Sequence, residues 1–298
     1  MAIRTLVLDF DGTCTDVPAV HQKYLDEVLR LFNEKLAAQP AEAHAQYSAV
    51  EWEAALDEVR GHSPEAGWML RNVPSAPAAA DPYILAGEAV AWLNRKAQRK
   101  WDPNIDLHTR ANNAAEAPFR PELNKVLEAV AALGVKIHFI SNSAKKKIEE
   151  RLDQQLSGKP SLRKEIVVDG DAAKFCVQEL PWDRPFDAGL RARFERLPTE
   201  ATRRLARPIY LRRGSYMSAL GKVWRGDAAN GPRTTLVCGD IWELDLALPD
   251  ALGCAVHLIE RGAPYSTYAY ELDAMTQARR GSSSGDLNGM LAVLKTLV

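Results

Sequence analysis

The sequence predicts an α/β fold, in which a parallel sheet has helices on both faces and a helical segment is inserted after the first strand. Short apolar segments alternate with amphipathic helical segments through much of the chain, a pattern typical of a parallel sheet covered on both faces. A long stretch without strand character directly follows the first apolar segment. The 298 residues are 46% hydrophobic and 26% charged, an ordinary globular composition.

Five segments are expected to form the strands of this sheet. They are short and rich in β-branched residues, as buried parallel strands usually are. In chain order they are residues 3–8, 135–140, 165–168, 234–238 and 255–259.

The clearest helix is predicted within the segment RPELNKVLEAVAALG, which places its leucines and valines on one face at a 3.6-residue period. Pro121 stands at its start and Gly134 just past its end, the usual boundary residues of a helix. A second helix is expected at 144–156, after the strand at 135–140. At the end of the chain, a flexible linker (Gly281–Asp286) is expected to precede a short amphipathic helix (Leu287–Val298) that docks on the core.

Residues 14–118 differ from the rest of the chain. They are rich in Ala, Glu and Leu, and helices are expected near 19–38, 41–60 and 83–100. No strand is predicted there, and Pro74, Pro77 and Pro82 divide the stretch into two pieces. The expected domains are therefore a core made of residues 1–13 and 119–298, and a helical insertion made of residues 14–118.

The bulk properties argue against several classes of protein. The net charge of −1 gives no overall field for binding a polyanion. The four cysteines have no CxxC spacing, so neither a disulfide framework nor a zinc site is expected. The first apolar run ends at Asp9, so no signal peptide is predicted, and no apolar run reaches the roughly 18 residues of a membrane span. We therefore expect a cytoplasmic protein without membrane association.

Polar residues follow three of the predicted strands. In an open parallel sheet the carboxyl ends of the strands meet at one edge, where such folds place their active sites. Any one of these residues alone would be an ordinary turn residue. The combination D-x-D-G-T is much rarer, and it falls at the end of the first strand. The residues at this edge are Asp9, Asp11, Ser141, Asn142, Ser143, Asp240 and Asp245.

Three segments carry a resemblance to a known family. The segments DFDGT (9–13), FISNS (139–143) and CGDIWELD (238–245) resemble, in order and spacing, the motifs of the haloacid dehalogenase superfamily. The helical stretch 14–118 lies where that family inserts its type 1 cap. The resemblance implies a hydrolase with a Rossmann-like core.

The resemblance also implies roles for the acidic residues. Asp9 would be the nucleophile that forms an aspartyl-phosphate, and Asp11 would be the general acid and base. The Asp9 carboxylate, the backbone carbonyl of Asp11 and the Asp240 carboxylate would hold Mg²⁺, which prefers oxygen ligands. Asp245 would position the metal site.

Phosphate binding is implied for four further positions. Ser141 would donate a hydrogen bond to a phosphoryl oxygen, beside Asn142. Gly12, next to Thr13, would permit a tight turn that exposes backbone N–H groups to phosphate.

Asp11 separates two reaction classes of this family. The dehalogenases lack an acid two residues after the nucleophile, because cleavage of a carbon–halogen bond needs no general acid. Asp11 therefore indicates a phosphomonoester hydrolase acting on a small phosphorylated metabolite. Phosphonate hydrolysis through a cap lysine is a less favoured variant, and no cue selects among Lys23, Lys35, Lys96 and Lys100.

The family also uses a basic residue that neutralises the nucleophile and the phosphate. Lys174 and Arg213 are the two candidates. Arg213 is slightly preferred, because it precedes an amphipathic helix and its distance along the chain to Asp240 is more typical. Arg212 and Lys222 are less favoured.

A basic segment, residues 191–213, is not required by the compact core. It contains eight arginines and two acids. It is interpreted either as a solvated surface or, in an alternative function, as the contact of a non-enzymatic regulatory protein with an acidic partner. Nucleic acid is not expected as a partner, because aromatic residues are not interleaved with the arginines. The oligomeric state is left open.

The cap tryptophans also have two interpretations. Trp68, Trp92 and Trp101 lie near several arginines and lysines in the sequence. They either form the aromatic walls of a substrate pocket or pack in the core of the cap.

Overall fold

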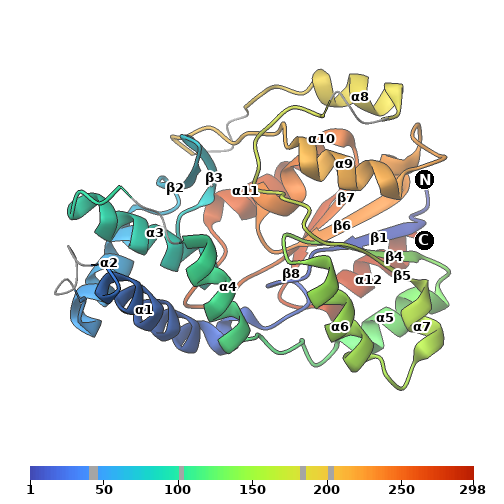
Figure 1. Ribbon diagram of the computed structural model, residues 1–298. Coiled ribbons are helices and arrows are strands. Elements are labelled where there is room, and N and C mark those ends of the chain that lie inside the picture. Colours follow the sequence, from blue (N-terminus) through green and yellow to red (C-terminus); the bar gives the residue numbers. More distant parts are fainter. Residues whose placement is uncertain (40–45, 101–103, 182–185, 201–204) are drawn as a thin grey trace.

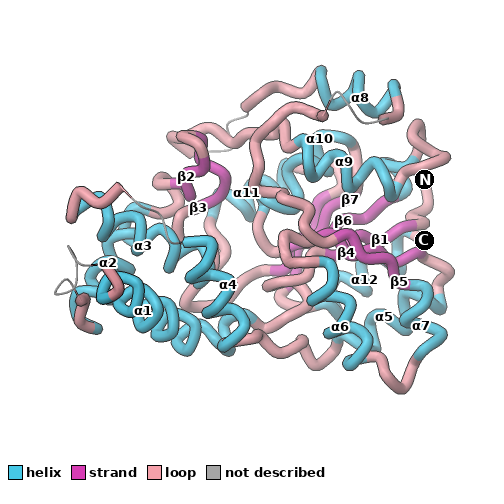
Figure 2. Tube along the Cα trace, viewed as in Figure 1, coloured by secondary structure: helices cyan, strands magenta, loops and turns pink. Residues whose placement is uncertain are grey.

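The computed structural model describes residues 1–39, 46–100, 104–181, 186–200 and 205–298. Its main feature is a six-stranded sheet with the order β5-β4-β1-β6-β7-β8, in which every neighbouring pair is parallel (Figure 2). The strands are β1 (Thr5–Leu8), β4 (Lys136–Ile140), β5 (Ile166–Asp169), β6 (Thr235–Gly239), β7 (Ala255–Ile259) and β8 (Gly281–Ser284). The five expected strands are present, with boundaries shifted by at most two residues, and the predicted fold class is confirmed.

The sixth strand corrects one expectation. Residues 281–284, expected to begin a flexible linker, form β8 and pair with β7. The segment Gly-Ser-Ser-Ser contains no apolar residue, so hydrophobic patterning could not predict a strand there. Its serines are held by the neighbouring strand instead, because the buried ring of His257 hydrogen-bonds through Nδ1 to Ser282 Oγ and through Nε2 to Ser284 Oγ, both at 2.8 Å.

His257 predicts a pH dependence of stability. Burial lowers the pKa of its imidazole to about 4, whereas a histidine in an unfolded chain titrates near 6.5. Between these two values the unfolded chain binds the extra proton, so the free energy of unfolding falls as the pH falls. From pH 7.5 to pH 5 we expect the contribution of His257 to fall by about 2 kcal/mol.

The measurement is urea unfolding of the wild type and of His257→Gln at both pH values. The difference between their unfolding free energies isolates this group from the carboxylates that also titrate. The same pH slope in both proteins would contradict the prediction.

Helices cover both faces of the sheet (Figure 1). Side chains alternate along β1, so Leu6 and Leu8 pack on one face and Val7 on the other. The first face is covered by α5 (Leu123–Ala132), α6 (Lys145–Gln155), α7 (Pro160–Glu165) and α12 (Leu287–Leu297). The second face is covered by α8 (Ala188–Glu195), α9 (Gly214–Val223), α10 (Ala247–Leu252) and α11 (Ala269–Gln277). The helices expected at 120–134, 144–156 and 287–298 are thus confirmed.

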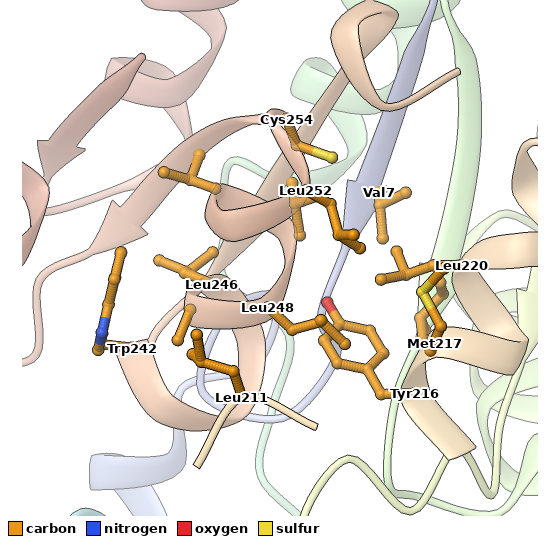
Figure 3. Packing of buried hydrophobic residues seen from close by; sticks show 14 of the residues in the cluster. Val7, Leu211, Tyr216, Met217, Leu220, Trp242, Leu246, Leu248, Leu252 and Cys254 are labelled. Atoms are coloured by element: carbon orange, nitrogen blue, oxygen red, sulfur yellow. The ribbon is translucent and has the colours of Figure 1, made fainter. Parts of the chain in front are cut away.

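The second face is closely packed. Figure 3 shows Tyr216 and Met217 of α9 beside Val7 of β1, and Leu248 and Leu252 of α10 on the same cluster. The Tyr216 hydroxyl donates to the backbone carbonyl of Asp245 at 2.8 Å. This bond ties α9 to a π-helical turn, η3 (Trp242–Leu246), that follows β6. Short 3-10 turns also lie at η1 (Val17–Val20) and η2 (Gly231–Thr234).

The stretch after β1 forms a separate cluster of helices beside the sheet (Figure 1). The helices expected near 19–38, 41–60 and 83–100 correspond to α1 (His21–Ala37), α2 (Ala49–His62) and α3 (Pro82–Lys96); positions 40–45 lie outside the described residues. A further helix, α4 (Asn104–Ala114), was not expected.

The expectation that this stretch contains no strand is wrong. β2 (Gly67–Leu70) and β3 (Val73–Pro77) form an antiparallel hairpin. Arg71 and Asn72, with φ of 50° and 66°, make its two-residue turn. Pro74 and Pro77, interpreted above as breaks, are tolerated because every strand of a two-stranded sheet is an edge strand.

Two chain segments connect the helical stretch to the core, and they run side by side. Thr15 and Phe119 form an antiparallel bridge. Asp16 N–H donates to Pro118 O at 2.8 Å, and Arg120 N–H donates to Cys14 O at 2.9 Å. The division of the chain at residues 14 and 118 stays a prediction. In the described part of the chain, no helix has the length and apolarity needed to cross a membrane.

Candidate active site

Three buried carboxylates meet at the carboxyl edge of the sheet. Asp9 follows β1, Asp240 follows the neighbouring β6, and Asp245 lies in the turn η3. One carboxylate oxygen of each lies within 4.8 Å of the others, and the residues are only 7%, 4% and 3% exposed. The parallel order of β1 and β6 therefore brings together groups more than 200 positions apart in the chain.

A single buried ammonium group neutralises part of this charge. Lys174 Nζ contacts Asp9 Oδ1 and lies 2.5 Å from Asp245 Oδ1. Burial by itself would lower the pKa of Lys174, but the charges of Asp245 and Asp9 outweigh it and raise the pKa. Lys174 is thus the charged partner of both aspartates.

The preference for Arg213 over Lys174 is wrong, because Arg213 is bonded elsewhere. Its buried guanidinium donates to the backbone carbonyls of Ser75 at 2.6 Å and Lys174 at 2.8 Å. Arg213 therefore ties β3 to the loop that carries Lys174. The less favoured candidates also lie elsewhere: Arg212 pairs with Glu179, and Lys222 pairs with Asp169. Chain spacing was misleading because the loop after β5 reaches the same sheet edge.

The carboxylates carry more charge than the lysine can neutralise. Burial raises the pKa of Asp9 to about 7, even though Lys174 opposes this shift. Burial, together with the charge of Asp245, also raises the pKa of Asp240 well above its usual range. In the described part of the chain, these three acids against one lysine leave an excess of buried negative charge, which a divalent cation would relieve. The all-oxygen donor set fits Mg²⁺.

The loop after Asp9 is closely fitted to Asp240. Gly12 has φ of +81°, and a Cβ at this position would overlap the Asp240 carboxylate, so glycine is needed for both reasons. Thr13 Oγ1 lies 3.4 Å from Asp9 Oδ2 and from Asp240 Oδ1. The N–H of Gly12 donates to Thr15 Oγ1 at 3.1 Å. It is therefore engaged within the loop rather than directed at a ligand.

Asp11 stands apart from the three buried carboxylates. It is half-buried, and its Oδ2 accepts a hydrogen bond from Ser143 Oγ at 2.5 Å. Ser143 was noted at the strand end without a role. Its N–H also donates to the hydroxyl of the buried Ser141, at 3.1 Å. Ser143 thus links Asp11 to Ser141.

Asn142 is hydrogen-bonded to the loop that carries Lys174. Its side-chain oxygen accepts a hydrogen bond from the N–H of Lys174 at 2.7 Å. The strand end at β4 therefore orients both Asp11, through Ser143, and Lys174, through Asn142.

A buried ion pair supports the Asp240 turn and was missed in the sequence. The Arg261 guanidinium contacts the backbone carbonyl of Asp240 and lies 2.5 Å from Glu271 Oε2. Glu271 Oε1 accepts from the N–H of Trp242 at 3.0 Å. Arg261 and Glu271 therefore hold the backbone on both sides of Ile241. They belong to no motif, so only the packing of α11 shows their position.

The cap contributes tyrosines to the region of Asp11. Tyr24 Oη lies 2.9 Å from His108 Nδ1, and the rings of Tyr24 and Tyr83 meet edge to face with centroids 4.8 Å apart. Burial raises the pKa of Tyr83, and the charge of Asp11 adds to this shift. Among the described residues, the buried Tyr83 hydroxyl has no hydrogen-bond partner.

The tryptophans noted in the sequence do not line this region together. Trp68 packs against Phe175, and Trp92 lies under the Lys96 ammonium; Trp101 lies outside the described residues. Of the cap lysines considered for phosphonate hydrolysis, Lys35 pairs with Asp106, while Lys23, Lys96 and Lys100 are exposed.

Comparisons with known proteins identify the family. Residues 3–207 match the family model described as "Hydrolase: haloacid dehalogenase-like hydrolase". No curated protein matches the chain. Several solved structures are similar over nearly the whole chain, at identities too low to transfer an activity. A predicted phosphoglycolate phosphatase from Haemophilus somnus 129PT is 16% identical, with a TM-score of 0.48 and coverage of 98% of this chain and 97% of that one.

Two further solved structures are similar to this chain. A putative HAD-hydrolase, YfnB from Bacillus subtilis bound to magnesium, is 14% identical with a TM-score of 0.46 and covers 99% of each chain. The L-2-haloacid dehalogenase from Xanthobacter autotrophicus is 15% identical with a TM-score of 0.44, covering 99% of this chain and all (100%) of that one. On the family match, which spans more than two thirds of its residues, this chain belongs to the haloacid dehalogenase-like hydrolases.

Proposed function

We propose that the protein is a Mg²⁺-dependent phosphomonoester hydrolase that acts on a small phosphorylated metabolite through an aspartyl-phosphate on Asp9. One observation carries the proposal: a second acid, Asp11, is hydrogen-bonded to Ser143 beside the cluster of Asp9, Asp240 and Asp245. A carbon–halogen bond releases halide without a proton, so a dehalogenase has no use for this acid. An alkoxide leaving group needs one.

The metal assignment rests on the donor set. Asp9 and Asp240, together with the backbone carbonyl of Asp11, would hold the ion, and Asp245 would support it. When bound, Mg²⁺ neutralises the phosphate and lets a carboxylate approach it. The buried negative charge left over by Lys174 supports this assignment.

Each residue then has a defined task. An oxygen of Asp9 attacks phosphorus, and the bond between phosphorus and the ester oxygen breaks. Asp11 donates its proton to the leaving oxygen, then takes a proton from water as that water attacks the aspartyl-phosphate. Phosphate leaves, and the Asp9 carboxylate is restored. Ser141 donates to a phosphoryl oxygen, while Lys174 opposes the protonation of Asp9 and holds its carboxylate in position.

The test of this proposal is Asp11→Asn. With an alkyl phosphate we expect the rate to fall about 10²- to 10⁴-fold, the usual contribution of a general acid. With p-nitrophenyl phosphate, a good leaving group, we expect a burst of p-nitrophenol equal to the enzyme concentration, followed by slow turnover, because the variant also lacks the base.

Two outcomes would count against the proposal. One is an Asp11→Asn variant that hydrolyses both esters as fast as the wild type. The other is halide release from a 2-haloacid by the wild type without phosphatase activity. EDTA should abolish phosphatase activity, and Mg²⁺ should restore it.

The alternative function, in which segment 191–213 contacts an acidic partner, has less support. Several of its described arginines are engaged within the chain. Arg207 pairs with Glu243 at 2.6 Å and donates to Pro64 O at 2.8 Å, and Arg212 and Arg213 are bonded as described above. Arg203 and Arg204 lie outside the described residues.

A further inference from the structure

A large cavity lies away from the carboxylates. Its volume is about 650 Å³, and its charged lining comprises Arg193, Arg196, Arg233, Arg279, Arg280 and Asp250. We call it the arginine pocket. Its remaining lining among the described residues is small or apolar and contains no aromatic side chain.

The arginine pocket is separate from the candidate active site. Arg233 lies just before β6 and Arg280 just before β8, so the pocket is at the amino edge of the parallel sheet. Asp9 and Asp240 lie at the carboxyl edge. Strands of four or five residues, at about 3.3 Å per residue, separate the two edges by roughly 15 Å. A ligand here would not touch the hydrolytic residues.

The pocket concentrates positive charge in a protein whose net charge is −1. Its five guanidinium groups come from α8 and its end, from η2, and from the segment before β8, and they face one carboxylate. Arg193 and Arg280 are anchored, because they donate to the backbone carbonyls of Ala229 and Arg233 at 3.0 and 2.7 Å.

The other three arginines are available to a ligand. Arg196, Arg233 and Arg279 are exposed, and none of them forms a side-chain ion pair within the described residues. The fold therefore brings three unneutralised cations beside two anchored ones, against their mutual repulsion. A bound anion would remove this repulsion.

The lining indicates the class of that anion. A cavity of this volume suits a small molecule. Guanidinium groups bind phosphate oxygens through two parallel hydrogen bonds, and five of them exceed what one phosphate can use. Because no aromatic side chain lines the pocket in the described part of the chain, these residues offer no platform for stacking a base. We propose that the arginine pocket binds a small ligand carrying two or three linked phosphate groups, recognised through its phosphates.

The test is calorimetric titration of the full chain with inorganic tripolyphosphate in EDTA, which keeps the catalytic site free of metal. We expect one site per chain, with orthophosphate binding at least tenfold more weakly. ATP should bind within about threefold of tripolyphosphate, because the nucleoside finds no stacking partner.

A matched pair of triple variants locates the site. Arg196→Ala, Arg233→Ala and Arg279→Ala together should weaken tripolyphosphate binding at least tenfold and leave phosphatase activity unchanged. The control, Arg95→Ala, Lys125→Ala and Lys164→Ala, removes the same charge from exposed positions elsewhere and should bind as the wild type does.

Four results would overturn the inference. They are the absence of binding, equal weakening in both triple variants, a changed affinity for tripolyphosphate in Asp240→Asn, and tighter binding of a single-stranded RNA that displaces tripolyphosphate. The second would show a bulk charge effect, the third binding at the carboxylate site, and the fourth an extended polymer as the ligand.

Discussion

Asp9→Asn is expected to lower the rate of phosphate ester hydrolysis at least about 10⁴-fold, since removing a covalent nucleophile has effects of this size or larger. The amide has the shape of the carboxylate but cannot form the aspartyl-phosphate. The fold should remain, because the substitution removes one of the buried charges while Lys174 keeps its contact with Asp245. The assay is p-nitrophenyl phosphate hydrolysis with Mg²⁺, and circular dichroism checks the fold.

Asp16→Asn is the matched control, because Asp16 lies in the same connection after β1 without a side-chain cap contact. Its activity should be close to that of the wild type. If Asp9→Asn retained a tenth of the wild-type rate, Asp9 would not be the nucleophile, and the proposed mechanism would fall.

Lys174→Met is expected to have the largest effect on stability. It would leave the buried carboxylates of Asp9 and Asp245 without their positive partner, a loss that usually costs about 3–5 kcal/mol when one member of a buried pair is removed. Activity should fall as well, because Asp9 would be held less firmly and would take up a proton more easily. Urea unfolding in EDTA measures the first effect.

Added Mg²⁺ should restore part of the lost stability, because the cation relieves the same excess of negative charge. Lys222→Met is the matched control: Lys222 pairs with Asp169 but is 58% exposed, so its loss should cost at most about 1 kcal/mol. Equal destabilisation by the two variants would show that the buried contacts of Lys174 contribute no more to the free energy of unfolding than the exposed ion pair of Lys222 does.

The fold could be predicted because its signals are local. The β-branched segments that became β1, β4, β5, β6 and β7 and the 3.6-residue apolar period of α5 each follow from short stretches of chain. β8 and the β2–β3 hairpin could not be predicted in this way. β8 is held by the ring of His257 on the neighbouring strand. The hairpin tolerates Pro74 and Pro77 because its two-stranded sheet has no third strand that would need the backbone N–H groups that prolines lack.

The residues of the candidate site also differ in whether the sequence alone could predict them. Asp9, Asp11, Ser141 and Asp240 were identified in the sequence because a parallel sheet must bring the ends of its strands to one edge. The choice between Lys174 and Arg213 was misjudged, since distance along the chain favoured Arg213, whereas the packing of the loops decides which side chain reaches Asp9.

By itself, the sequence determined the fold class, the family resemblance and the acids at the strand ends, because strand direction alone sets where those residues lie. The tertiary structure decided which cation neutralises them, how Arg261 and Glu271 hold the turn after Asp240, and that five arginines meet at the opposite edge. These features depend on contacts between residues that lie far apart in the chain. Side-chain packing decides which of those residues meet, and no local sequence pattern encodes that packing.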